Sequence, residues 1–107
     1  MAVRGNFIGG EWLAGREAAA NINPSDLADV IGDYAQASQA ETEAAVAAAR
    51  AALPRWREVT IQQRFEILDR IGSEILARQD ELGRLLSREE GKTLPEGVGE
   101  VVRAGMI

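Results

Sequence analysis

The sequence predicts an α+β fold in which a β-hairpin and further strands, within residues 1–37, precede three to four helices, within residues 38–107. Three observations support this prediction. Two adjacent glycines separate short apolar segments near the N-terminus. From residue 38 onward, three capping boxes occur, in which serine or threonine is followed three residues later by glutamate or glutamine. In the same region, apolar residues recur at steps of three and four. The first pattern is typical of a hairpin, and the other two are typical of amphipathic helices.

The N-terminal region is interpreted as a hairpin followed by two strands. Gly9 and Gly10 supply the positive φ angles that a two-residue hairpin turn requires, and apolar pairs stand on either side of them. An extended segment is expected over residues 18–22, ending at the turn sequence Asn-Pro-Ser-Asp of residues 23–26. The next strand is predicted over residues 30–35.

The first helix is predicted from residue 39 to about Leu53. Ser38 is the first residue of a capping box, which marks the helix start. Alanine fills most of the inner side, with Val46 and Leu53 as the larger residues. Because alanine contributes little burial, this helix needs a neighbour. Pro54 is expected to end it.

Residues 60–92 are expected to form a helix, a tight hinge and a shorter helix. The apolar stripe lapses over residues 77–81, where Asp80 is expected to cap the second helix, and Gly91 suits the left-handed conformation that follows a helix C-terminus. A helix pair of this length cannot bury its stripe alone. The stripe consists of Ile61, Phe65, Leu68, Ile71, Ile75, Leu82, Leu85 and Leu86.

A further helix is predicted over residues 96–107. It follows a third capping box, formed by Thr93 and Glu96, with Pro95 in a first-turn position. The periodic pattern then stops without a terminating glycine or a basic last turn. We therefore expect this chain to be the front part of a longer protein.

Composition and charge exclude several classes of function. The net charge of −5 and the absence of a basic run argue against nucleic acid or an anionic membrane as the partner. No apolar segment approaches the roughly 20 residues of a membrane span, so the cytoplasm is the expected location. The sequence contains no cysteine and no histidine, which excludes disulfides and the usual zinc and iron sites.

The motifs with possible chemistry have simpler interpretations. Residues 91–93 (Gly-Lys-Thr) match the end of a phosphate-binding loop, but Leu86 stands where that loop requires a glycine, which favours a helix terminator. Residues 97–99 lack the third glycine of the dinucleotide motif and lie in a helical context. The adjacent Glu89 and Glu90 would point about 100° apart on a helix, so we expect one solvated and one structural carboxylate, not an acid–base pair.

Five motifs follow one another along nearly the whole chain: NFIGGEW, then NINPSD with VIG, then Ala49-Arg50 leading to Trp56, then Gln63-Arg64 through Leu68 and Ile75, and finally REEGK with GEV. In this order they resemble the N-terminal segment of the aldehyde dehydrogenase superfamily. Residues 61–97 most resemble bacterial α-ketoglutaric semialdehyde (2,5-dioxovalerate) dehydrogenases.

The resemblance implies that residues 1–107 are the N-terminal portion of a coenzyme-binding domain within the α/β aldehyde dehydrogenase fold. It implies oxidation of a small-molecule aldehyde, such as a semialdehyde acid, to a carboxylic acid with NAD or NADP, by a homo-oligomeric enzyme. In that family a cysteine attacks the aldehyde, hydride passes to the nicotinamide, and a glutamate-activated water hydrolyses the thioester. No catalytic or nucleotide-binding residue of that mechanism lies in this chain, which is therefore expected to be inactive alone.

The resemblance also implies two peripheral sites. Backbone carbonyls of Asn21 and Ile22, with the Glu89 carboxylate, correspond to a monovalent cation site of some members; the alternative is that Glu89 caps a helix or forms a salt bridge. Arg103 lies in the helix that passes the mouth of the substrate tunnel and could attract a substrate carboxylate; the alternative is a solvated surface arginine. For the chain as a whole, the alternative is a self-associating helical module without catalysis.

Overall fold

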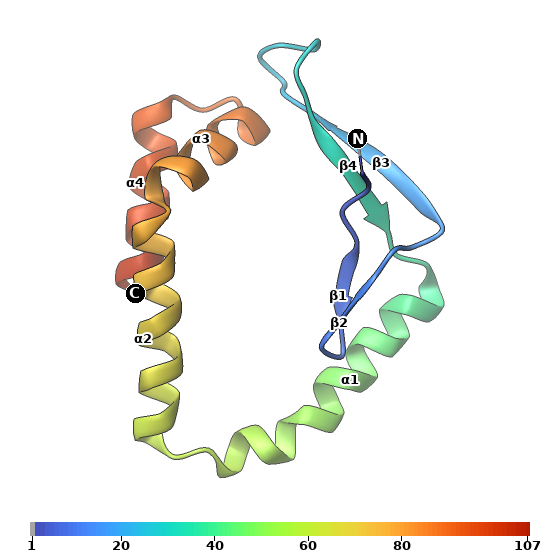
Figure 1. Ribbon diagram of the computed structural model, residues 1–107, viewed down its shortest axis with the longest axis vertical. Helices are drawn as coiled ribbons and strands as arrows, with labels where there is room; N and C mark the ends of the chain where they lie inside the picture. The colour runs from blue at the N-terminus through green and yellow to red at the C-terminus, as the bar shows by residue number, and fades with distance from the viewer. Residues whose placement is uncertain (1) are drawn as a thin grey trace. The chain divides into compact units, whose positions relative to one another are not determined.

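The computed structural model describes residues 2–107, which form four helices and two two-stranded sheets (Figure 1). This confirms the α+β class. The elements are β1 (Asn6–Ile8), β2 (Glu11–Leu13), β3 (Glu17–Ile22), β4 (Val30–Gln36), α1 (Gln39–Glu58), α2 (Ile61–Ala77), α3 (Gln79–Glu90) and α4 (Leu94–Met106). Two compact units are present. The first unit contains the residues up to Asn21 and Val30–Val59, and the second contains Ile22–Asp29 and Thr60–Ile107.

The hairpin of the first unit forms where the sequence predicts it. Strands β1 and β2 pair antiparallel, with Phe7 opposite Trp12. Gly9 and Gly10 make the turn with φ angles of 61° and 86°, values that residues with a Cβ rarely adopt. The Phe7 and Trp12 rings lie 5.0 Å apart between centroids in a tilted arrangement and remain largely exposed.

Strands β3 and β4 form the second sheet. Arg4 adds to β4 through a parallel bridge, in which the Arg4 N–H donates to the Asp33 carbonyl and the Ala35 N–H donates to the Arg4 carbonyl, both at 2.8 Å. Ala35 is buried with 8% of its surface exposed. A Cβ on Gly15 would lie 2.9 Å from the Ala35 Cβ, so the loop before β3 passes directly over this strand.

Helix α1 does not end at Pro54, and that prediction is wrong. The helix continues through Pro54 to Glu58, and the Val59 N–H then donates to the Trp56 carbonyl at 3.2 Å. Proline removes only the one hydrogen bond that the Arg50 carbonyl would accept. The turn beyond it keeps its own hydrogen bonds, so a helix of 20 residues tolerates the loss.

The larger apolar residues of α1 are not on its inner side as expected. Val46 is 56% exposed and Leu53 is 41% exposed, whereas Ala45 and Ala48 are half-buried. The hairpin approaches the helix on the alanine side, where a Cβ on Gly9 would lie 3.8 Å from the Ala48 Cβ. Small side chains therefore form the contact between α1 and the hairpin.

The three helix starts that capping boxes predict are confirmed. At Ser38 and at Thr60 both hydrogen bonds of the capping box form, with distances of 2.8 to 3.2 Å. At Thr93 the carboxylate of Glu96 accepts from the backbone N–H at 3.1 Å and from the hydroxyl at 2.8 Å. Each arrangement satisfies donors that the first turn of a helix leaves without an intrahelical partner.

Asp80 does not cap α3, which corrects the prediction for the hinge. Arg78 alone separates α2 from α3: its N–H still donates to the Glu74 carbonyl at 3.2 Å, and it also occupies the capping position of α3 without a side-chain cap bond. Because the hinge takes a single residue, Asp80 lies inside the first turn of α3, where a carboxylate favours the positive end of the helix dipole. The Arg78 side chain instead forms an ion pair with Glu81 at 2.6 Å.

Glycines let α4 pack closely against both α2 and α3, beside which it runs in Figure 1. A Cβ on Gly97 would lie 2.6 Å from the Gly83 carbonyl oxygen, and one on Gly72 would lie 2.6 Å from the Gly105 carbonyl oxygen. Val101 stands midway between Gly97 and Gly105 and is 8% exposed. Residues spaced by four share one face of a helix, so this face of α4 forms the core of the second unit.

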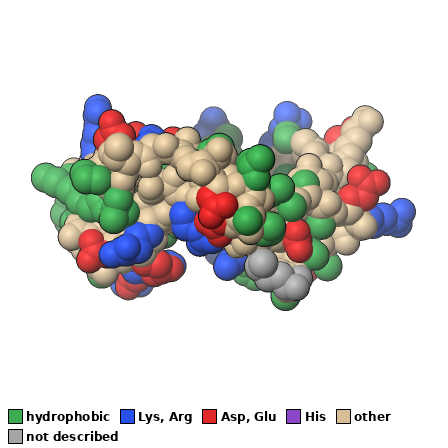
Figure 2. Space-filling model, turned by 90° about the horizontal axis from the view of Figure 1, so that it is seen from above, with side chains coloured by type: hydrophobic (Ala, Val, Ile, Leu, Met, Phe, Trp, Pro, Cys, Tyr) green, Lys and Arg blue, Asp and Glu red, His purple; other side chains and the backbone are tan. Residues whose placement is uncertain are grey.

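Much of the α2 stripe remains uncovered, as the sequence predicts for a helix pair without a partner. No α2 residue is buried; Ile61 is 87% exposed, and Phe65 and Leu68 are each 60% exposed. In the view of Figure 2, hydrophobic side chains lie at the surface among acidic and basic ones. Within residues 2–107, every helix is too short or too polar to span a lipid bilayer.

Candidate functional site

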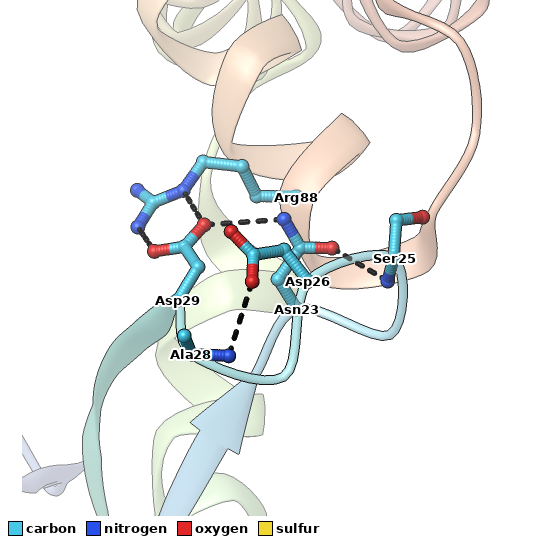
Figure 3. Close-up of polar contacts among 6 residues, drawn as sticks. All are labelled: Asn23, Ser25, Asp26, Ala28, Asp29 and Arg88. Carbon is cyan, nitrogen blue, oxygen red and sulfur yellow. Dashed lines mark hydrogen bonds and ion pairs between the residues drawn. The ribbon is translucent and has the colours of Figure 1, made fainter.

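The turn between β3 and β4 is held by its own polar side chains (Figure 3). The Asn23 Oδ1 accepts from the Ser25 N–H at 2.9 Å, and the Asp26 Oδ1 accepts from the Ala28 N–H at 3.1 Å. The Asn23 N–H also donates to the Asp29 carbonyl at 3.0 Å, which closes the turn. Asparagine and aspartate favour such turns because their side chains accept from backbone N–H groups two residues ahead.

Arg88 of α3 fixes this turn to the helices of the second unit. Its Nε donates to Asp29 Oδ2 at 2.9 Å and its Nη2 donates to Oδ1 at 2.6 Å, while Asn23 Nδ2 donates to Oδ2 at 3.1 Å. The Arg88 hydrogen bonds, followed by that of Asn23, lower the pKa of Asp29 from 3.8 to about 2. The carboxylate is thus held ionised and oriented by three donors, an arrangement that sequence analysis did not identify.

The C-terminus of α3 ends against the same turn. Gly91 adopts a φ of 71°, which confirms it as the left-handed helix terminator, and its N–H donates to the Ser87 carbonyl at 2.9 Å. A Cβ at this position would lie 3.1 Å from Pro24 Cγ and 3.0 Å from Ser25 Oγ. Glycine is therefore favoured at position 91 by its backbone conformation, and a Cβ there would also require the turn to shift slightly.

Lys92 joins α3 to α4 through two carboxylates. Its Nζ lies 2.7 Å from Glu90 Oε2 and also contacts Glu100 Oε1. These hydrogen bonds, that of Glu100 first, raise the pKa of Lys92 from 10.5 to about 12. The Lys92 carbonyl accepts from the Ser87 hydroxyl at 2.7 Å. Within the Gly-Lys-Thr triplet, Gly91 thus ends α3, Lys92 links α3 to α4, and Thr93 caps the start of α4.

The predicted peripheral residues lie on several elements. Asn21 and Ile22 are the last two residues of β3, and Glu89 is half-buried in the last turn of α3. Arg103 is exposed in the last turn of α4. Among residues 2–107 no group of three or more histidine, cysteine or carboxylate side chains could hold a metal ion. The carbonyl-based cation site and the role of Arg103 stay predictions.

The glycine-containing motifs do not fit a dinucleotide. The dinucleotide motif lies in the turn between a strand and a helix, whereas residues 97–99 lie inside α4. Gly97 allows close packing against the Gly83 carbonyl. Lys92 is engaged by two glutamates. We therefore assign no step of nucleotide chemistry to these residues.

Comparison with known proteins identifies a family. The model of the aldehyde dehydrogenase family matches residues 12–107. N-succinylglutamate 5-semialdehyde dehydrogenase of Chromobacterium violaceum is 44% identical over 96 residues, which is 89% of this chain and 20% of that protein. Alpha-ketoglutarate semialdehyde dehydrogenase of Haloferax volcanii is 38% identical over 101 residues, covering 92% of this chain and 21% of that protein. The chain thus spans about a fifth of the length of these relatives.

The fold agrees with this similarity. The crystal structure of an NADP-dependent enzyme of E. coli superposes with a TM-score of 0.89 at 38% sequence identity, covering 95% of this chain and 21% of that one. The resemblance to α-ketoglutaric semialdehyde dehydrogenases is confirmed, and it extends to other semialdehyde dehydrogenases. From the match over residues 12–107 and this shared fold, we conclude that the chain belongs to the aldehyde dehydrogenase family.

Proposed function

We propose that this chain is the N-terminal portion of the coenzyme-binding domain of an NAD(P)-dependent aldehyde dehydrogenase, which oxidises an aldehyde to a carboxylic acid. The observation that carries the proposal is the family match over residues 12–107. Two relatives named after semialdehyde substrates support it, as does the NADP dependence of the E. coli enzyme.

In this proposal the chain supplies structure and not the reacting groups. It has no cysteine to act as nucleophile and no histidine, so the catalytic residues belong to the remainder of the enzyme. The exposed apolar face of α2, including Ile61, Phe65 and Leu68, is the surface that the remainder would cover. The bound nucleotide would supply the hydride acceptor. The residues described above would hold together the helices of the coenzyme-binding domain.

The substrate in this proposal is an aldehyde that also carries a carboxylate, such as α-ketoglutaric semialdehyde. The names of the relatives support this class. Arg103 is the residue we assign to attraction of the distal carboxylate, because a guanidinium is always charged and offers a planar fork to a carboxylate. Its exposed position on α4 leaves its side chain accessible.

The remaining expectations stay predictions. They are the cation site at Asn21, Ile22 and Glu89, the homo-oligomeric assembly and the cytoplasmic location. The alternative function, a self-associating helical module without catalysis, is not favoured, because the sequence and fold match an enzyme family over nearly the whole chain.

The test is an activity assay of the complete gene product that contains this segment. With α-ketoglutaric semialdehyde and NAD or NADP, we expect formation of the reduced nicotinamide, monitored by absorbance, and formation of the dicarboxylic acid. The 107-residue chain alone is the matched control and should give neither product. Activity of the chain alone, or failure of the complete protein with every semialdehyde and both nucleotides, would overturn the proposal.

A further inference from the structure

Lys92 is the only lysine in the sequence, and every other basic residue is an arginine. Lysine and arginine differ in their reactivity toward aldehydes. A lysine amine that loses its proton has a lone pair and condenses with aldehydes, whereas a guanidinium keeps its charge at all ordinary pH values. The chain therefore offers aldehydes a single reactive side-chain amine.

The structure places that amine between two carboxylates from different helices. Glu90 is the last residue of α3, and its Oε2 lies 2.7 Å from the Lys92 Nζ. Glu100, in the middle of α4, contacts the same nitrogen. The Lys92 side chain is 21% exposed, and both carboxylates contact its amine directly.

We infer that Glu90 and Glu100 shield Lys92 from imine formation with aldehydes. Imine formation begins when the neutral amine attacks the carbonyl carbon to give a carbinolamine, which then loses water. An ammonium held by two carboxylates has no lone pair for the first step, and the raised pKa of Lys92 is consistent with this state. The benefit to the protein rests on the proposed function, since an aldehyde dehydrogenase repeatedly meets such compounds.

Reductive trapping tests the inference on the complete gene product that contains this chain. The protein is incubated at neutral pH with propanal and sodium cyanoborohydride, which converts each imine to a stable secondary amine, and the adducts are quantified by peptide mass spectrometry. Propanal is chosen because it is uncharged, so replacing carboxylates does not change its local concentration. The N-terminal α-amino group, with an ordinary pKa near 8, is the internal reference.

We expect the Glu90→Gln/Glu100→Gln variant to form the Lys92 adduct about tenfold faster, relative to the N-terminal amine, because the pKa of Lys92 returns toward its usual value. Glu81→Gln is the matched control, since it removes a carboxylate paired with Arg78, and it should leave the Lys92 rate unchanged. Circular dichroism establishes that the variants keep their helix content.

If the double variant loses its helices, two other comparisons replace it. The first is the Glu100→Gln single variant against wild type. The second is wild type with and without guanidinium chloride, where unfolding should accelerate formation of the Lys92 adduct by a similar factor. The inference is overturned if folded wild-type Lys92 reacts as fast as in denaturant, or if a folded variant reacts no faster than wild type. Since the assay involves no nucleotide and no turnover, its outcome is separate from that of the activity assay.

Discussion

Arg88 and Asp29 are 59 positions apart in the sequence and form a two-pronged ion pair, with donor–acceptor distances of 2.9 and 2.6 Å. This contact joins the turn at 22–29 to α3, and the turn belongs to the same compact unit as the helices that begin at Ile61. A fork of two parallel hydrogen bonds fixes orientation as well as distance, so the turn is positioned and not merely attracted.

Replacing Arg88 with lysine should loosen the turn although the charge is kept. Lysine carries a point charge and cannot supply the two parallel donors that Asp29 receives. We expect faster amide hydrogen exchange at Asn23 and Asp29, measured by NMR, with the amides of α4 unchanged. Arg84→Lys, on the same helix and exposed, is the control. Equal exchange in the wild type and in Arg88→Lys would show that the fork contributes nothing.

The docking of the turn should also depend on pH in the acidic range. The folded-state pKa of Asp29 is about 2, below its ordinary value of 3.8. For a lowered pKa the contribution is fully present above about pH 4 and is lost as the pH falls through about 2. The chemical shift of the Asp29 amide should therefore titrate with a midpoint near 2. Asp29→Asn should abolish this transition, and a midpoint near 4 in the wild type would contradict the geometry.

Local signals predicted the hairpin and the helix starts marked by capping boxes correctly. The capping boxes at Ser38 and Thr60 and the glycine turn at 9–10 form because their hydrogen bonds and φ angles involve residues within three positions. Two local rules failed. Pro54 stays within α1, because a long helix tolerates one lost hydrogen bond, and Asp80 is inside α3, because the hinge takes only one residue.

Contacts between distant segments were beyond prediction from one sequence. Nothing in the pattern around Asp29 indicates that Arg88 will bind it, because the pairing depends on how the turn docks on α3. The contact of Gly97 with Gly83 is of the same kind, since each glycine lies in a helix where alanine would be expected to serve better. The contacts of the candidate site could therefore be found only in the tertiary structure, whereas the helices and strands that carry them were predictable from local sequence.

The helix thermodynamics can be checked at Thr60. Thr60→Ala removes the acceptor of the Gln63 N–H and should lower the free energy of unfolding by about 1 kcal/mol, measured by urea denaturation with circular dichroism. Thr60→Ser keeps the hydroxyl and should lose only a small part of that amount. If serine and alanine destabilise equally, the capping bond is not the cause.

Two glycines of α4 provide a matched pair for close packing. Gly97→Ala should destabilise the second unit by about 1–3 kcal/mol, because the new Cβ would lie 2.6 Å from the Gly83 carbonyl oxygen, which belongs to the backbone and cannot rotate away. Gly99→Ala meets nothing within 4 Å and should stabilise the helix by up to about 1 kcal/mol. Thermal unfolding of both variants measures the difference, and two equal shifts would contradict the packing described here.

Arg103 offers the most direct test of the proposed substrate class, in the complete enzyme. Arg103→Ala should raise KM for α-ketoglutaric semialdehyde several-fold and leave kcat nearly unchanged, because loss of a group that attracts the distal carboxylate weakens ground-state and transition-state binding alike. A neutral aldehyde of similar length is the substrate control, and its KM should not change. Arg103→Lys is the matched variant: it keeps the charge without the fork, so an intermediate KM separates attraction from geometry. If KM for the acidic aldehyde is the same in Arg103→Ala and in the wild type, the exposed guanidinium is a solvated surface group and the carboxylate is recognised elsewhere in the enzyme.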